Sequence, residues 1–94
     1  MDIDDCLFSN DALDVKAKKI VNYLSGKIKE EYICDFKETY LFGEEGIALE
    51  NICMHINSFN IKISSEIFIL LKDICISYGV DLDYLKDIEH LIID

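Results

Sequence analysis

The stretch Gly43-Glu44-Glu45-Gly46-Ile47-Ala48-Leu49-Glu50 places two carboxylates between two glycines and continues with an apolar run at helical spacing. Glycine favours a turn, and acidic residues stabilise the positive end of a helix dipole, so the stretch predicts a turn that leads into a helix. It belongs to a wider acidic segment with Glu30, Glu31, Asp35 and Glu38, offset by Lys37. So many carboxylates beside one turn indicate a surface that binds a partner.

Helical periodicity extends upstream and downstream of this turn. The following helix is predicted over Glu45 to Phe59, and it buries Ala48, Leu49, Ile52, Cys53 and Ile56. The preceding helix is predicted over Glu30 to Phe42 and ends at Gly43. Its core face carries Tyr32 or Ile33, Phe36, Tyr40 and Leu41, and its outer face carries Glu31, Asp35 and Glu38. The outer face of that helix is therefore acidic.

Two further helical patterns lie beyond this pair, and one precedes it. The first has Leu13, Ala17, Ile20, Val21 and Leu24 on one side, with Ser9 or Asn10 as the cap and Gly26 at the end. A fourth helix is predicted from the cap Ser64 to Tyr78, before Gly79, and its wide apolar face predicts that it is central in the bundle. A last helix starts at the cap Asp81 and carries Leu82, Leu85, Ile88, Leu91 and Ile92.

Two short segments look strand-like, namely residues 6–8 and 61–63, and both are too short to build a sheet. The chain lacks proline, and its 51% hydrophobic content exceeds that of disordered proteins. We therefore expect an all-α protein, in which residues 1–94 form one compact bundle of four to five helices with short links.

The charge balance limits the possible partners. The chain has nine lysines, no arginine and a net charge of −10, which disfavours direct binding to nucleic acid or to an anionic membrane surface. A cationic protein is the natural partner of such a field. The alternative interpretation is that the acidity only keeps the protein soluble. The longest apolar run, Ile67 to Leu71, is too short to span a bilayer.

The four cysteines are interpreted as free thiols. The N-terminus is acidic where a secretory signal would be basic, and Cys34, Cys53 and Cys75 lie within helical apolar patterns. We expect a cytoplasmic protein with these three thiols buried. Cys53 and His55 point to different sides of a helix, and the chain has no CxxC pair, so no metal site is expected.

No catalytic constellation is recognised in the sequence. The carboxylates fall mainly on outward faces, and both GxGxxG and the P-loop pattern are absent. We expect no enzyme activity, no cofactor and no small-molecule substrate. The turn Gly79-Val80-Asp81-Leu82-Asp83 is a remote match to acyl carrier proteins, but Leu82 stands where their modified serine would be.

Three blocks of sequence carry a closer resemblance. They are residues 43–53, which begin G-E-E-G-I-A-L-E, then Ile61-Lys62-Ile63-Ser64, then Gly79-Val80-Asp81 with Tyr84 and Leu85. In this order the blocks resemble the MafI-type immunity proteins, which are akin to the immunity proteins of contact-dependent growth inhibition in bacteria. The family-like part covers residues 42–92, and the preceding residues show no comparable motif.

The resemblance implies a small cytoplasmic protein that neutralises a cognate secreted toxin, often a cationic nuclease, in a 1:1 complex and without turnover. Carboxylates would then pair with basic residues of the toxin, and exposed aromatic residues would serve as anchors. The candidate partner-binding residues are Glu31, Asp35, Glu38, Glu44, Glu45, Glu50, Tyr32 and Tyr40.

An adaptor or regulatory domain is the alternative function class. Ile69 and Ile76 are seven residues apart on the fourth helix, and they could form an apolar stripe for a partner helix or a second copy. The expectation favoured by the sequence is that both pack under the first helix.

Overall fold

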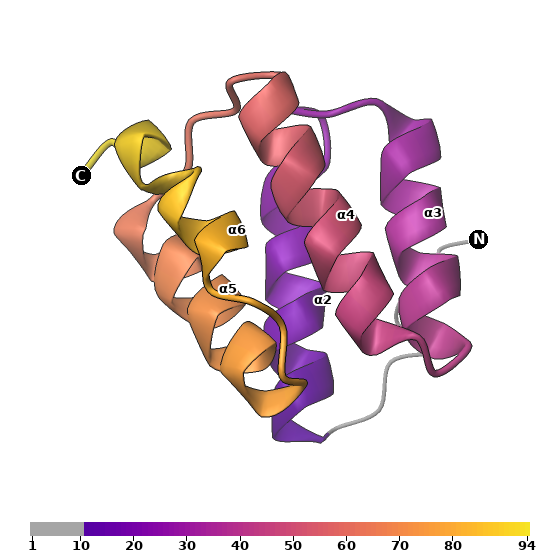
Figure 1. The fold of residues 1–94 in the computed structure, drawn as a ribbon. Coiled ribbons are helices and arrows are strands. Elements are labelled where there is room, and N and C mark those ends of the chain that lie inside the picture. Colours follow the sequence, from indigo (N-terminus) through magenta and orange to yellow (C-terminus); the bar gives the residue numbers. More distant parts are fainter. Residues whose placement is uncertain (1–10) are drawn as a thin grey trace.

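A computed structural model of the protein describes residues 11–94, and these residues form helices joined by short links (Figure 1). The elements are α2 (Ala12–Leu24), α3 (Glu30–Leu41), α4 (Glu45–Ser58), α5 (Ser65–Ser77) and α6 (Asp83–Lys86), followed by a 3₁₀ turn, η1 (Glu89–Leu91). Within the described range no strand is formed, apart from two isolated bridges. The predicted all-α fold is confirmed.

The helices pack mainly as two pairs, α3 with α4 and α2 with α5. Figure 1 shows α5 on one flank and α3 on the other, with α2 and α4 between them. The prediction that the fourth helix is central is therefore wrong. Its outer side faces solvent, with Ile69 56% and Ile76 55% exposed, so the expectation that both isoleucines pack under the first helix is also wrong.

Helix α2 begins with a cap on Asp11. The Asp11 carboxylate accepts a hydrogen bond from the Leu13 backbone N–H at 3.0 Å, which satisfies one of the free donors of the first turn. The predicted caps, Ser9 and Asn10, lie outside the described residues. Of the residues predicted on its core face, Ala17, Ile20, Val21 and Leu24 are buried and Leu13 is half-buried.

The core is formed by the faces that the spacing predicts. Helix α4 buries all five expected residues, Ala48, Leu49, Ile52, Cys53 and Ile56. Cys53 and Cys75 are buried free thiols, as expected. Cys34 is only half-buried, with its Sγ 3.9 Å from Glu30 Oε1, because it lies beside the exposed face of α3. The expectation of a buried Cys34 is therefore wrong.

The last predicted helix is broken into α6 and η1. Its apolar residues recur every three positions at Leu82, Leu85, Ile88 and Leu91, a spacing that drifts around an α-helix but aligns on a 3₁₀ helix. The backbone follows that spacing, because Leu85, Ile88 and Leu91 each donate to the carbonyl three residues earlier. This arrangement buries Leu85, Ile88 and Leu91 together, and Leu82 remains partly exposed.

The link before α5 pairs with the C-terminal segment. Ile63 N donates to Leu91 O at 3.1 Å, and Ile93 N donates to Ile63 O at 3.0 Å, which forms one parallel bridge. Ser64 then caps α5 as predicted, with its hydroxyl accepting from Ile67 N. Among the described residues, no helix combines the length and the apolar character that crossing a membrane requires.

Candidate functional site

The α3–α4 hairpin, residues 30–58, carries far more carboxylates than lysines. Its sequence contains a single lysine, Lys37, and that side chain is only 7% exposed. The seven carboxylates of the hairpin belong to Glu30, Glu31, Asp35, Glu38, Glu44, Glu45 and Glu50. The hairpin therefore presents negative charge to solvent with no exposed lysine to balance it. We call this surface the α3–α4 face.

Three of the predicted site residues form one row. Glu31, Asp35 and Glu38 are exposed and lie four and three positions apart, which places them on the same side of α3. We call these three residues the acidic stripe. None of them makes an ion pair or a side-chain hydrogen bond with the described part of the chain. Their charges are thus available to a partner.

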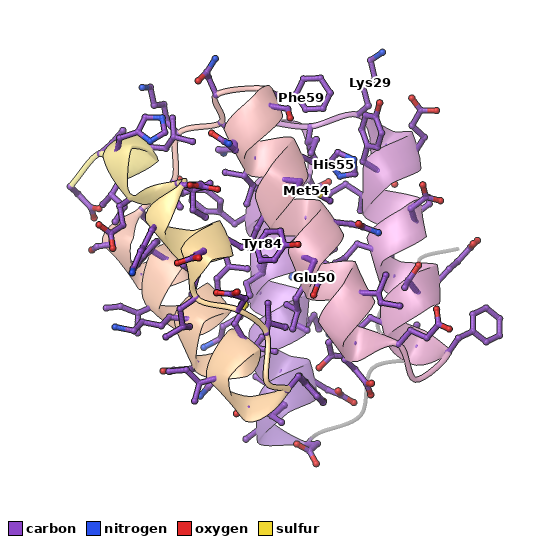
Figure 2. The ribbon with its side chains drawn as sticks, in the orientation of Figure 1. Lys29, Glu50, Met54, His55, Phe59 and Tyr84 are labelled. Atoms are coloured by element: carbon purple, nitrogen blue, oxygen red, sulfur yellow. The ribbon has the colours of Figure 1, made fainter. Side chains whose placement is uncertain are left out.

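The remaining predicted carboxylates are more dispersed. Glu44 is exposed at the turn, and Glu45 is half-buried in the first turn of α4. Glu50 lies on the other side of α4, next to Tyr84 of α6 in Figure 2. Its carboxylate is close enough to α5 to act on the pKa of Cys75. The structure therefore separates Glu50 from the acidic stripe.

The two predicted aromatic anchors have different environments. Tyr40 is 3% exposed, and its hydroxyl lies 3.4 Å from that of Tyr78. Burial, reinforced by this hydrogen bond, raises the pKa of Tyr40 far above its ordinary value. Tyr40 belongs to the core, so its assignment as a possible exposed anchor is wrong. The helical spacing placed it correctly on the core face.

Tyr32 lies in an aromatic cluster at the surface. Its ring centroid is 4.2 Å from that of His55 and 5.5 Å from that of Phe59. Figure 2 shows Phe59 at the end of α4, near Lys29, with His55 and Met54 farther along the same helix. The cluster joins α3 to α4 beside the acidic stripe and leaves Phe59 about half exposed (45%).

Several exposed apolar residues on the hairpin were not predicted as site residues. Phe42 is 84% exposed at the end of α3, and Ile47 and Met54 are about half exposed on α4. Phe42 lies eleven positions after Glu31, so it continues the acidic stripe by helical spacing. The outward faces of both helices already contained this signal, since the buried positions were identified correctly.

A small hollow lies between α3 and α4. It has a volume of about 30 Å³ and is lined by Tyr32, Asp35, Phe36, Thr39, Ala48, Asn51, Ile52 and His55. The Nδ1 atom of His55 is buried and has no hydrogen-bond partner among the described residues. A buried polar atom without a partner is rare in folded proteins.

The buried thiols of Cys53 and Cys75 interact with each other in the core. Their mutual hydrogen bond, together with burial, raises the pKa of Cys53, and the same bond lowers the pKa of Cys75. A protonated, enclosed thiol such as Cys53 is a poor nucleophile. Among residues 11–94, no group of three or more histidine, cysteine or acidic side chains is placed to hold a metal ion.

Comparison of the chain with protein-family models, curated proteins and solved structures finds no match. Its function therefore has to be inferred from the α3–α4 face and from the three sequence blocks described above.

Proposed function

We propose that this protein binds a cationic protein through the α3–α4 face. The observation that carries the proposal is that the exposed surface of residues 30–58 has carboxylates and no lysine. A field of one sign accelerates the encounter with a partner of opposite charge and selects against other partners. Glu31, Asp35 and Glu38 provide its exposed row, with Glu44 and Glu45 at the neighbouring turn.

The partner that fits this surface and the family resemblance is a basic toxin domain. In this proposal the protein is a bacterial immunity protein of the MafI type that acts in the cytoplasm and forms a 1:1 complex with its toxin. A nuclease toxin needs basic residues to bind phosphates. Carboxylates that form ion pairs with those basic residues block the binding of the nucleic acid, so inhibition requires neither turnover nor a cofactor.

The positions of the three sequence blocks support a shared fold signature. Residues 43–53 include the α3–α4 turn and most of α4, residues 61–66 form the link and the cap of α5, and residues 79–85 form the α5–α6 junction. Each block thus includes a helix junction, where backbone geometry restricts the sequence. The proposed contact residues of α3 lie outside the blocks, as expected for residues that vary with the toxin.

The test uses the neighbouring gene. A short basic C-terminal domain of a large secreted protein encoded next to this chain is the candidate toxin, and co-expression measures protection of the host. Replacing Asp35 and Glu38 by lysine should abolish protection of the host. The affinity for the toxin should fall about 10- to 100-fold, and this loss should depend steeply on salt concentration. Glu44→Lys with Glu45→Lys should weaken binding in the same direction.

The matched control is Asp87→Lys with Glu89→Lys, which changes the net charge equally at two exposed positions near η1. This control should protect nearly as well as the unmodified protein. Equal loss of binding in both double variants would mean that net charge, and not the position of the carboxylates, determines binding. Unchanged affinity in the Asp35/Glu38 variant would refute a role for the acidic stripe.

An adaptor function remains the second candidate, because Ile69 and Ile76 form an exposed apolar pair on α5. A partner helix or a second copy that covered them would bind nearly as well at high salt as at low salt. Replacing both isoleucines by glutamate would then abolish binding, whereas the lysine substitutions on α3 would not.

A further inference from the structure

The hollow between α3 and α4 is built from two matching rows of side chains. On each helix the lining residues stand at positions i, i+3, i+4 and i+7, so each row occupies one side of its helix. The row of α3 is Tyr32, Asp35, Phe36 and Thr39, and the row of α4 is Ala48, Asn51, Ile52 and His55. The two helices are a closely packed pair, which fixes the rows against each other.

The polar atoms of this lining favour a hydrogen-bond donor. Asp35 carries the single formal charge among the eight lining residues, and a carboxylate only accepts hydrogen bonds. Thr39 and Asn51 add one side-chain oxygen each, and neither side chain makes a hydrogen bond to the described part of the protein. With the ring proton on Nε2, the Nδ1 of His55 is a further acceptor, and it is unsatisfied.

The apolar part of the lining favours a cation. The ring of Tyr32 packs against that of His55, with centroids 4.2 Å apart and planes tilted by 37°, and Phe36 also lines the hollow. The face of an aromatic ring attracts an ammonium or guanidinium group, and a carboxylate beside it adds a charge-assisted hydrogen bond. The volume of about 30 Å³ exceeds what a single water requires.

We infer that this hollow receives the side-chain cation of a lysine or arginine from the protein bound to the α3–α4 face. The inference rests on the proposed function, because it assigns one group of the cationic partner to one place on that face. Asp35 binds the charge, Tyr32 packs on its alkyl stem or its face, and the acceptors of Asn51 and His55 take the remaining N–H groups. The acidic stripe would steer the partner, and this hollow would fix its register.

The experiment uses hexalysine as the probe and NMR of the full chain as the measurement. Titration should shift the ring resonances of His55 and the side-chain amide of Asn51 together with the backbone of the acidic stripe. Asp35→Asn should reduce the size of the His55 chemical-shift changes about fivefold. Glu38→Gln, which removes the same charge from the same stripe but does not line the hollow, should weaken them less than twofold.

Hexaarginine in place of hexalysine distinguishes the guanidinium from the ammonium group, and stronger shifts of His55 with either peptide support the inference. His55→Phe keeps an aromatic ring beside Tyr32 and removes Nδ1, so it should reduce the Asn51 shifts while the fold is retained. Movement of stripe resonances without movement of His55 and Asn51 would overturn the inference, and so would equal effects of Asp35→Asn and Glu38→Gln. If the hollow holds only water, Asp35→Asn and Glu38→Gln would have equal effects.

This experiment needs no toxin, so its failure is separate from failure of the proposed function. If His55 does not respond but co-expression protects the host, the proposed binding through the α3–α4 face stands and the cation site is wrong. If His55 responds but no toxin is bound, the cation site stands and the immunity role is wrong.

Discussion

Single residues show where helical periodicity is informative and where it is not. The spacing places Tyr40 on the core face of α3, and the structure buries it there against Tyr78. Its assignment as an anchor relied on residue type, since tyrosine is enriched at interfaces. Phe42, two positions later, is the exposed aromatic residue of this helix end. One step of two residues turns a side chain to the opposite side of a helix.

The burial of Tyr40 predicts a stability loss in alkaline solution. Its pKa in the folded protein is raised above the ordinary value of 10.0 by desolvation and by hydrogen bonding to Tyr78 and Asp14. The unfolded chain therefore loses the proton first, and the contribution of Tyr40 to stability is complete below pH 10 and declines as the pH rises above it. Urea unfolding measured at pH 7 and at several values above pH 9 checks this.

Tyr40→Phe should cost about 1 kcal/mol at neutral pH through the lost hydrogen bond, and it should flatten the alkaline decline. Tyr84→Phe is the control, since the Tyr84 hydroxyl has no hydrogen bond to residues 11–94. An equally steep decline in the Tyr40 variant would assign the effect to other groups.

The helix junctions carry the information at the scale of elements. Gly43 follows α3 with φ of +88°, a left-handed conformation that side chains disfavour, and Glu44 N donates to Thr39 O at 3.1 Å to close the turn. Helix α5 is fixed in the same way at its start by Ser64. These junctions were predicted correctly because a cap or a turn depends on a few adjacent residues. The α6–η1 segment was not, because a three-residue repeat was interpreted as α-helical.

The two glycines of the Gly43–Gly46 turn should respond oppositely to alanine. Gly43→Ala should destabilise the fold by about 1 kcal/mol or slightly more, because an alanine disfavours the positive φ at this position. A steric clash does not contribute, since the new Cβ meets no atom within 4 Å. Gly46 is helical, and a Cβ there makes an ordinary 3.9 Å contact with Val80 Cγ2. Gly46→Ala should therefore stabilise by about 0.5 kcal/mol. Urea unfolding of both variants decides the sign.

If Gly43→Ala is neutral, the turn adopts another conformation than the one described. If Gly46→Ala destabilises, the α4–Val80 contact is tighter than its distance indicates.

For the whole molecule, the acidic surface has a cost for the free protein. A net charge of −10 repels itself, and Asp35 lies one helical turn from Glu31 and from Glu38, which are like-charge neighbours. A protein that keeps like charges together on its surface for binding is expected to be less stable than one with mixed surface charges. A surface that only provides solubility would not need its charges in one row.

Glu38→Lys should therefore raise the melting temperature of the free protein by about 2–4 °C at low salt while it weakens partner binding. Lysine at this position replaces a repulsion with Asp35 by an attraction between residues three positions apart. Thermal unfolding is measured at about 20 mM and about 500 mM NaCl, where charges are screened over about 20 Å and about 4 Å respectively. The gain should shrink at high salt. Glu89→Lys, far along the chain near η1, serves as the control with the same charge change, and a fall in the melting temperature of the Glu38 variant would contradict the prediction.

The sequence by itself determined helices α2 to α5, most of their core faces and the Ser64 cap of α5, because each depends on residues within one or two turns of the same helix. It also located the carboxylates of Glu31, Asp35 and Glu38 on an outer face. Only the tertiary structure decided that α5 lies on a flank with Ile69 and Ile76 exposed, that Glu50 is separated from the stripe, and that His55 and Asp35 share a hollow. Periodicity describes the two sides of one helix, whereas coverage of a side chain depends on which other helix packs against it.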